Sequence, residues 1–188
     1  MPKVLLPIGD GTEVLDTMYP IFRLPEDGFE VVVAGPEARY YHGVMHEIPP
    51  NEPIPWDITR EQPAYYVKAT VAFRDVEPAD YAGLFLSGGR APEYLRYDQD
   101  LLRITRHFFE AKKPVAIVCH GVEIAAAAGV LQGRTLTTVA KCALDITQVG
   151  GKYVDRPCVV DGHLVSARTW HDNTELLKQF IRLLKART

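Results

Sequence analysis

The sequence predicts a doubly wound α/β fold, in which a mostly parallel sheet lies between two layers of helices. Its start alternates between the two kinds of element: Val4–Ile8 is apolar, an amphipathic stretch continues to about Leu24, and Phe29–Ala34 is apolar again. Such a strand–helix–strand unit implies parallel strands. Two later runs, Gly83–Leu86 and Val115–Val118, are too short for helices and indicate strands buried on both faces.

The rest of the chain continues this alternation with shorter elements. The pattern predicts a strand near a sheet edge, two helices, a short strand, another helix, a hairpin and a final helix. In order, these are Tyr65–Phe73, Leu101–Ala111, Val122–Ala128, Arg134–Val139, Cys142–Val149, Cys158–Val160 with Leu164–Ser166, and the segment after Asp172.

A proline-rich segment at about residues 35–63 interrupts the alternation, and it contains Trp56 as well as six prolines. A long irregular stretch inside a compact domain is usually a lid, an interface or a loosely ordered insertion. We find no internal repeat and no second domain. We therefore expect residues 1–188 to form one domain that carries this insertion.

Composition excludes several classes of function. The chain has 188 residues and a net charge of −3, so it offers no basic field for nucleic acid or an anionic membrane. The apolar run after Lys3 is too short for a signal peptide, and no segment is long enough to span a bilayer, so we expect a cytoplasmic protein. Three widely spaced cysteines fit neither a disulfide framework nor a zinc-ligand pattern.

The segment around Cys119 carries the strongest chemical signal. The predicted strand Val115–Val118 stops at Cys119, and after His120 and Gly121 the chain turns at once into a helix. Such a nucleophile elbow exposes a side chain at the carboxyl end of the sheet and can strain its backbone. The helix N-terminus should lower the thiol pKa, and His120 could act as a base. Alternatively, Cys119 is a small buried residue at a strand end.

Two other segments bring polar groups to strand ends. Asp10 followed by Glu13 predicts a capping box that opens the first helix, with Glu13 and Asp16 on one face of its first turn. Acidic residues are common at helix starts, so this pair alone does not require a function. Gly88 and Gly89 could present backbone amides to an oxyanion, or could form a plain glycine turn.

Several other polar residues have structural explanations. His42 and His46 lack a third well-placed ligand, so we expect neither a metal nor any other cofactor. Asp172 and Glu175 predict a second capping box before the last helix. His171, just before it, could border an active site, although a surface position is the simpler interpretation. Cys142 and Cys158 are most simply structural.

Three motifs resemble those of the ThiJ/PfpI superfamily: SGGRAPEYL at Ser87–Leu95, PVAIVCHG at Pro114–Gly121 and AAGVLQGR at Ala127–Arg134. That superfamily includes protein deglycases, glyoxalase III enzymes, PfpI-type intracellular proteases and isocyanide hydratases. The resemblance covers nearly the whole chain and implies a flavodoxin-like fold with Cys119 as the elbow nucleophile. The insertion is most similar to the subgroup that contains plant glyoxalase III domains.

The resemblance also assigns expected roles. His120 matches the histidine beside the nucleophile, and Gly88 and Gly89 match the glycines whose amides face the thiolate. Glu93 matches the glutamate that PfpI-type oligomers donate to a neighbouring subunit, which implies a homodimer or larger oligomer. Asp16 stands where most relatives have a glutamate, and the isocyanide hydratase branch has aspartate.

Other positions concern the lining of the pocket. We expect Glu13 near the entrance and Gly121 and His171 at its border. Val139 replaces a tyrosine that several relatives carry, a departure that should alter the pocket.

These features favour cysteine-dependent chemistry on small α-oxoaldehydes such as methylglyoxal, or on glycated substrates, without glutathione. In this hypothesis Cys119 attacks the aldehyde, the amides of Gly88 and Gly89 stabilise the oxyanion, and His120 moves a carbon-bound proton. We expect Asp16 to be protonated beside the thiolate, because burial and like charge raise a carboxyl pKa. The alternatives are a PfpI-type peptidase that uses Glu93 of a neighbour, an isocyanide hydratase, and a non-enzymatic oxidation sensor.

Overall fold

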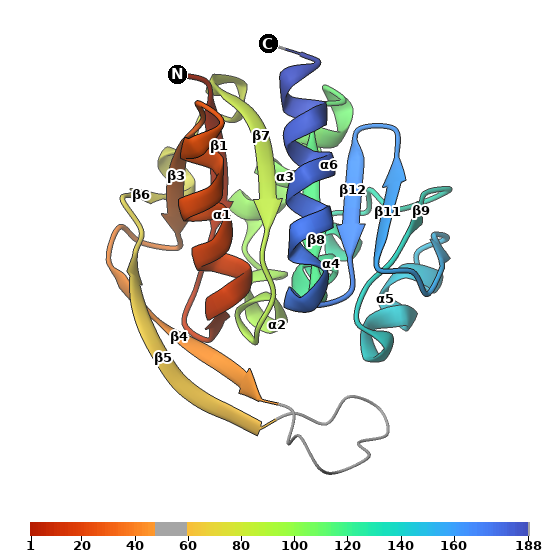
Figure 1. The fold of residues 1–188 in the computed structure, drawn as a ribbon, viewed down its shortest axis with the longest axis horizontal. Helices are drawn as coiled ribbons and strands as arrows, with labels where there is room; N and C mark the ends of the chain where they lie inside the picture. Colours follow the sequence, from red (N-terminus) through yellow and green to blue (C-terminus); the bar gives the residue numbers. More distant parts are fainter. Residues whose placement is uncertain (48–59, 188) are drawn as a thin grey trace.

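The computed structural model describes residues 1–47 and 60–187 and shows an α/β sandwich built on a seven-stranded sheet (Figure 1). The strand order is β11-β12-β8-β7-β1-β3-β6, and every pair is parallel except β11 with β12. This confirms the predicted fold class. In chain order the strands of this sheet are β1 (Lys3–Pro7), β3 (Glu30–Gly35), β6 (Val71–Ala72), β7 (Tyr81–Leu86), β8 (Val115–Val118), β11 (Cys158–Asp161) and β12 (Leu164–Ala167).

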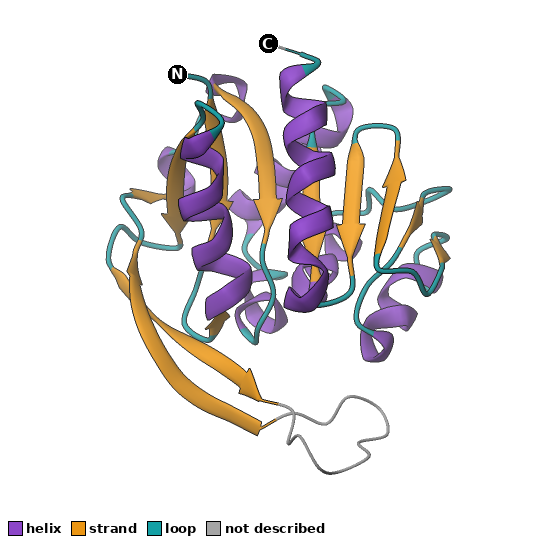
Figure 2. Ribbon diagram, viewed as in Figure 1, coloured by secondary structure: helices purple, strands orange, loops and turns teal. Residues whose placement is uncertain are grey.

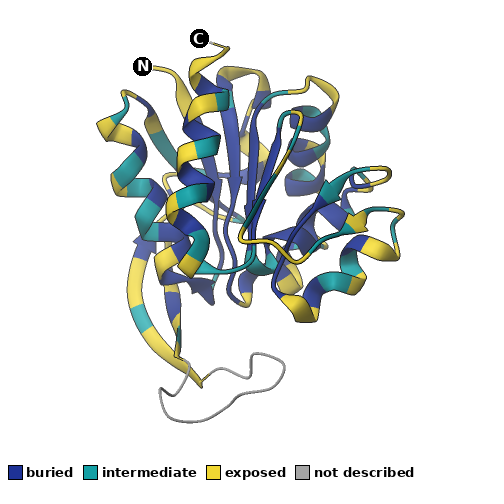
Figure 3. Ribbon diagram, turned by 45° about the vertical axis from the view of Figure 1, so that its right-hand side comes forward, coloured by how far each residue is buried: buried dark blue, intermediate teal, exposed yellow. Residues whose placement is uncertain are grey.

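Two layers of helices cover the sheet (Figures 1 and 2). One layer is α1 (Val14–Glu26) with α6 (Asn173–Lys185), whose apolar side chains share a core cluster with β1 and β8. The other layer contains α2 (Ala91–Leu95), α3 (Gln99–Glu110), α4 (Val122–Ala127) and α5 (Ala143–Thr147). The central strands are buried along almost their whole length (Figure 3), as their continuous apolar runs predict.

Much of the proline-rich insertion is regular, so the expectation of an irregular segment was wrong for its described part. Strands β4 (Tyr40–Glu47) and β5 (Arg60–Lys68) form a long antiparallel hairpin that extends beyond the sandwich (Figure 1). Pro63 is tolerated because β5 is the outer strand of the three-stranded sheet β2-β4-β5, where a missing N–H breaks no ladder. Trp56 and the prolines at positions 49–55 lie outside the described residues.

Several predicted boundaries also differ. The strand expected at 134–139 is only β9 (Thr135–Leu136), which pairs with β10 (Lys152–Tyr153) outside the main sheet. The strand expected over 65–73 is divided between β5 and the short edge strand β6. These short pairs depend on distant partners, which local sequence does not specify. None of the helices in the described residues is long and apolar enough to cross a bilayer.

Both predicted capping boxes were wrong. Helix α1 begins one residue after Glu13, whose own carboxylate accepts the backbone N–H of Asp16 at 2.6 Å. The side chain of Asp10 instead binds the base of the hairpin. Asp172 precedes α6, but its carboxylate accepts hydrogen bonds from Arg168 and does not cap the helix. In both cases a cation elsewhere in the fold takes the carboxylate that the local pattern assigned to the helix.

Candidate active site

The candidate site lies where the strand order changes direction. From β1 the chain proceeds to β3 on one side and later returns to β7 on the other, so the loops after β1 and β7 diverge at their carboxyl ends. Ligands of doubly wound proteins bind in such a crevice. Strand β8 lies next to β7 and adds the loop that begins at Cys119. The fold therefore brings together the three segments that carry the predicted residues.

Cys119 occupies a strained turn. Its φ is +54°, in the left-handed region that side chains other than glycine rarely adopt, and it begins a short 3-10 helix (Cys119–Gly121) that leads directly into α4. The hydroxyl of Thr138 donates a hydrogen bond of 2.7 Å to the Cys119 carbonyl. A side chain at Gly121 would lie 2.4 Å from the Leu86 carbonyl oxygen, so only glycine lets the turn pack against β7. The predicted strand–turn–helix geometry is confirmed.

The glycines after β7 bring that loop close to Cys119 and to the start of α1. A Cβ at Gly88 would stand 2.6 Å from Cβ and 3.1 Å from Sγ of Cys119. Gly89 has a φ of +85°, and a Cβ there would stand 2.3 Å from the backbone nitrogen of Glu13. That nitrogen donates to the Gly88 carbonyl at 3.1 Å. Any larger residue would therefore push the three loops of the site apart.

His120 contacts the thiol directly. Its Nδ1 lies 3.2 Å from Sγ of Cys119, within hydrogen-bonding distance for sulfur. Burial lowers the pKa of His120 to about 4, and the charge of Lys141 acts in the same direction. The imidazole is therefore neutral at pH 7 and can accept a proton.

Asp16 and Glu13 form a buried carboxyl pair beside Cys119. Asp16 is fully buried, and its Oδ1 accepts a hydrogen bond of 2.9 Å from Nδ2 of Asn173 at the start of α6. Burial raises the pKa of Asp16 well above its ordinary value, and the charge of Glu13 raises it further. Burial also raises the pKa of Glu13 to about 7. Burial and the charge of Glu13 thus both favour the neutral acid form of Asp16.

This chain resembles a known protein family, individual relatives within it, and solved structures. It matches the DJ-1/PfpI family over residues 2–183. The chain belongs to the DJ-1/PfpI family. It is 36% identical to deglycase TK1284 of Thermococcus kodakarensis and 34% identical to deglycase PfpI of Pyrococcus furiosus, each over 97% of this chain and 99% of the relative.

Solved structures of the family have the same fold. A two-domain protein from Anabaena variabilis, which contains DJ-1/ThiJ/PfpI-like and ferritin-like domains, superposes with a TM-score of 0.81 and 26% identity. The match covers all of this chain and 48% of that protein. The family resemblance inferred from three motifs is thereby confirmed along the whole chain.

The environment of the DJ-1/PfpI cysteine differs from the sequence-based expectation. Burial raises the pKa of the Cys119 thiol well above its ordinary value, and a charge on Asp16 would raise it further. The backbone amides of His120 and Gly89 act in the opposite direction. The helix N-terminus was expected to lower the pKa of the Cys119 thiol, but desolvation outweighs that effect. Protonation of Asp16 removes the repulsion that its charge would exert on a Cys119 thiolate.

Two residues assigned to the site from sequence contact groups other than Cys119 and His120. Glu93 lies on α2 with about half of its side chain exposed, and its carboxylate is 3.6 Å from Nε of Arg90. His171 stacks on Trp170 with ring centroids 3.5 Å apart. It shares a surface depression with Val139, the position of the missing tyrosine. Both roles stay predictions.

One side-chain cluster has the composition of a metal site. Ligand atoms of His120, Glu123 and Cys142 lie within 4.8 Å of one another, although the sequence analysis had expected no metal. Arg96 lies 3.4 Å from Glu123, and the charge of Lys141 also acts on His120. Arg96 already offsets the charge of the Glu123 carboxylate, so we assign no metal to the cluster.

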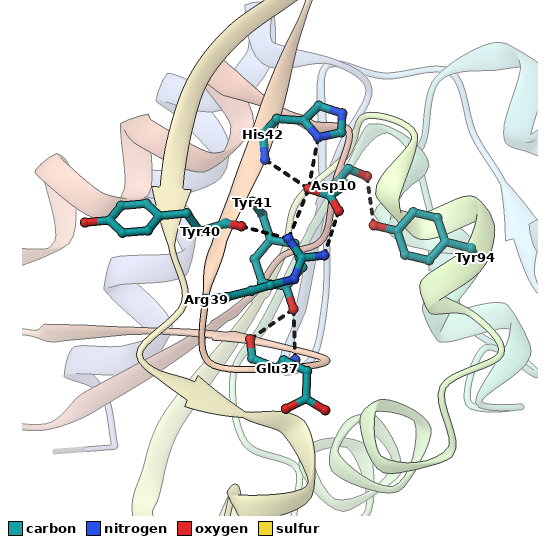
Figure 4. A network of polar contacts seen from close by, with 7 residues as sticks. All are labelled: Asp10, Glu37, Arg39, Tyr40, Tyr41, His42 and Tyr94. Carbon is teal, nitrogen blue, oxygen red and sulfur yellow. Dashed lines mark hydrogen bonds and ion pairs between the residues drawn. The ribbon is translucent and has the colours of Figure 1, made fainter.

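A second polar network fixes the hairpin beside the site (Figure 4). Oδ1 of Asp10, in the loop after β1, lies 3.0 Å from the backbone nitrogen and 2.9 Å from Nδ1 of His42. Its Oδ2 accepts a hydrogen bond of 2.7 Å from Arg39, and its carbonyl accepts one of 2.8 Å from the hydroxyl of Tyr94 on α2. Asp10 therefore connects the hairpin and α2 to the loop that precedes Glu13.

Proposed function

We propose that this protein is a cysteine-dependent enzyme that converts small α-oxoaldehydes such as methylglyoxal to hydroxy acids without glutathione, and that it acts as a deglycase on their adducts. The observation that carries the proposal is the Cys119 thiol, at a left-handed turn, 3.2 Å from a neutral imidazole. Relatives about one-third identical over the full chain are named deglycases, which supports the same reaction class.

In the first step His120 Nδ1 takes the proton from Cys119, since a neutral imidazole is the base nearest to Sγ. Protonated Asp16 stabilises the thiolate by donating a hydrogen bond toward it. Its unpaired Oδ2 and Sγ of Cys119 both lie within 3.1 Å of the point where a Cβ on Gly88 would stand. A charged aspartate at this position would oppose the same step.

The thiolate then attacks the aldehyde carbon, and the oxyanion that forms receives a hydrogen bond from the amide of Gly89. The oxyanion takes from His120 the proton that came from the thiol, which gives a neutral hemithioacetal and a free imidazole. His120 moves the proton from the former aldehyde carbon to the neighbouring carbon through an enediol, which leaves a thioester. Water hydrolyses the thioester and releases the hydroxy acid and free Cys119. An adduct of the aldehyde with an amine or thiol enters the same sequence after it releases its aldehyde.

The test is lactate formation from methylglyoxal without glutathione, compared between the wild type and Cys119→Ser. We expect many equivalents of lactate per wild-type chain and at least a hundredfold less from the variant, because nucleophilic catalysis supplies most of the rate (roughly two or more orders of magnitude). Cys158→Ser is the matched control, since Cys158 lies on β11 away from the elbow.

Two results would contradict the proposal. Loss of methylglyoxal without more than one equivalent of lactate would mean that the thiols only trap the aldehyde. Equal lactate formation by the wild type and Cys119→Ser would assign the reaction to another group.

A further inference from the structure

Asn173 is a buried polar residue that the chemistry above does not use. It is the first residue of α6, is 4% exposed, and is separated from Asp16 by 157 positions in the sequence. Its Nδ2 lies 2.9 Å from Oδ1 of Asp16, and this is a hydrogen bond between two buried side chains. A polar residue buried against a carboxyl must either satisfy that carboxyl or destabilise the fold.

The two oxygens of Asp16 have different surroundings. Oδ1 accepts the hydrogen bond from Asn173, whereas Oδ2 is buried with no hydrogen-bond partner among the described residues. Oδ2 is also the oxygen beside Cys119: it lies 2.7 Å, and Sγ of Cys119 lies 3.1 Å, from the point where a Cβ on Gly88 would stand. The carboxyl therefore presents a paired oxygen to α6 and an unpaired oxygen to the thiol.

We propose that Asn173 is a positioning residue that keeps the acid proton of Asp16 on Oδ2, from where it is donated to the Cys119 thiolate. In a neutral carboxyl the carbonyl oxygen is the better acceptor, so an amide N–H that points at Oδ1 favours the form of Asp16 that carries its hydrogen on the other oxygen. This inference rests on the proposed function in one respect, because the proposed reaction is what gives the thiolate a catalytic role. The hydrogen-bond arrangement itself can be tested without turnover.

The other charged and titratable groups that face Asp16 support this assignment. Glu13, at the start of the same helix, receives the backbone N–H of Asp16, and its charge favours the neutral form of Asp16. Cys119 faces Asp16 from the elbow, and mutual repulsion of two negative charges favours the same state. The hydrogen bond from Asn173 and the backbone amide of Gly88 act in the opposite direction, because both donate to the carboxyl and favour its charged form. Asn173 thus acts on which oxygen holds the proton, while its neighbours keep the proton in place.

The experiment is the pH dependence of Cys119 alkylation by iodoacetamide, with the modified cysteine identified by mass spectrometry. In Asn173→Leu, which has a similar volume and no donor, we expect Cys119 to react about tenfold more slowly at neutral pH, since loss of one directed charge-assisted hydrogen bond shifts a pKa by about one unit. Asp16→Asn gives the reference for complete loss of the acid proton.

The Asn173→Asp variant distinguishes two orientations of the Asn173 amide: one with Nδ2 facing Asp16, as in the structure, and one with the amide oxygen facing it. If Nδ2 faces Asp16, the substitution places an acceptor at Oδ1, draws the proton away from Oδ2, and slows alkylation at least as much as Asn173→Leu. If Asn173 presents its oxygen instead, Asn173→Asp reacts as the wild type does, and the proposal is wrong.

A purely structural role is distinguished by a control far from the site. Thr105→Val also removes a buried hydrogen bond, from the Thr105 hydroxyl to the Leu101 carbonyl within α3. It should lower the melting temperature without changing the alkylation profile. A profile of Asn173→Leu that coincides with that of the wild type would overturn the proposal, whatever its melting temperature. Lack of methylglyoxal turnover in the wild type would refute the proposed function and leave this test unaffected.

Discussion

At the scale of single residues, the site depends on two acids in a position where acids are costly. Glu13 and Asp16 are both almost completely buried, and each has a raised pKa. A carboxyl that holds its proton more tightly in the folded than in the unfolded chain stabilises the fold at low pH, and this contribution is lost as pH rises through the folded pKa. The neutral acid that the chemistry uses is therefore obtained at a cost in stability at pH 7.

The Glu13→Gln variant tests this cost. The pKa of Glu13 rises from 4.5 to about 7 on folding, so wild-type stability should fall relative to the variant between about pH 4.5 and about pH 7. The difference in unfolding free energy should grow by on the order of 3 kcal/mol over that window. Urea denaturation of both proteins at several pH values measures this difference in unfolding free energy. Because His120 is present in both proteins, its opposite contribution to the pH dependence cancels when the two free energies are subtracted.

Glu13→Ala serves as the comparison, because glutamine keeps the oxygen that accepts the Asp16 N–H and alanine does not. The alanine variant should show the same pH dependence with a constant additional loss of about 1 kcal/mol for the missing cap. Parallel stability curves for the wild type and Glu13→Gln would show that Glu13 titrates alike in the folded and unfolded chain.

At the scale of elements, Asp10 is the side chain that joins the base of the hairpin to the loop after β1. Its carboxylate accepts the backbone N–H of His42 and the guanidinium of Arg39, which also stacks on the ring of Tyr41 at 3.8 Å (Figure 4). Arg39 holds the pKa of Asp10 below its ordinary value. The hairpin thereby stays in a fixed relation to the loop that precedes Glu13, although most of its own surface is solvent-exposed.

Removal of this connection should loosen the hairpin without unfolding the sandwich. We expect Asp10→Ala to reduce the unfolding free energy by about 1 kcal/mol, since its partners are partly exposed, and to speed amide hydrogen exchange in β4 and β5. Glu37→Ala breaks an exposed ion pair with Arg74 nearby and should leave exchange in the hairpin unchanged. Equal exchange rates in Asp10→Ala and the wild type would mean that strand pairing alone holds the hairpin.

At the scale of the whole molecule, Glu93 is the residue that the family resemblance assigns to the site of a neighbouring subunit. Glu93 is half-exposed on α2 and forms an ion pair with Arg90 in its own subunit. If it completes the site, it must come from another copy. This requires an assembly in which α2 of one copy faces the elbow of the next.

We therefore expect the protein in solution to be at least a dimer of its 21.0 kDa chain. Glu93→Gln should lower kcat several-fold while the mass in sedimentation is unchanged, because an orienting carboxylate acts on the imidazole and not on assembly. A protein that is monomeric at assay concentration and fully active would assign Glu93 to the surface of α2 alone.

The amino-acid pattern alone predicts the α/β class, the strand–turn–helix at Cys119, and the presence of Asp16 on the first helix. Each depends on local signals: short apolar runs, a glycine after the Cys-His pair, and spacing within one helical turn. Motif resemblance then identified the family. The local patterns failed where an arginine outside the pattern bound the carboxylate, as Arg39 does for Asp10 and Arg168 does for Asp172.

The hairpin and the partners of the buried groups, in contrast, depend on how distant segments pack together. Strand β4 pairs with β2 and with β5, which begins beyond the undescribed segment, so its sequence alone does not specify a strand. Asn173 and Thr138 reach Asp16 and Cys119 from positions 157 and 19 residues away. Nothing in their own neighbourhoods predicts these contacts. Hydrogen bonds of this kind arise from the packing of α6 and the loop after β9 against the elbow, and packing is a property of the whole fold.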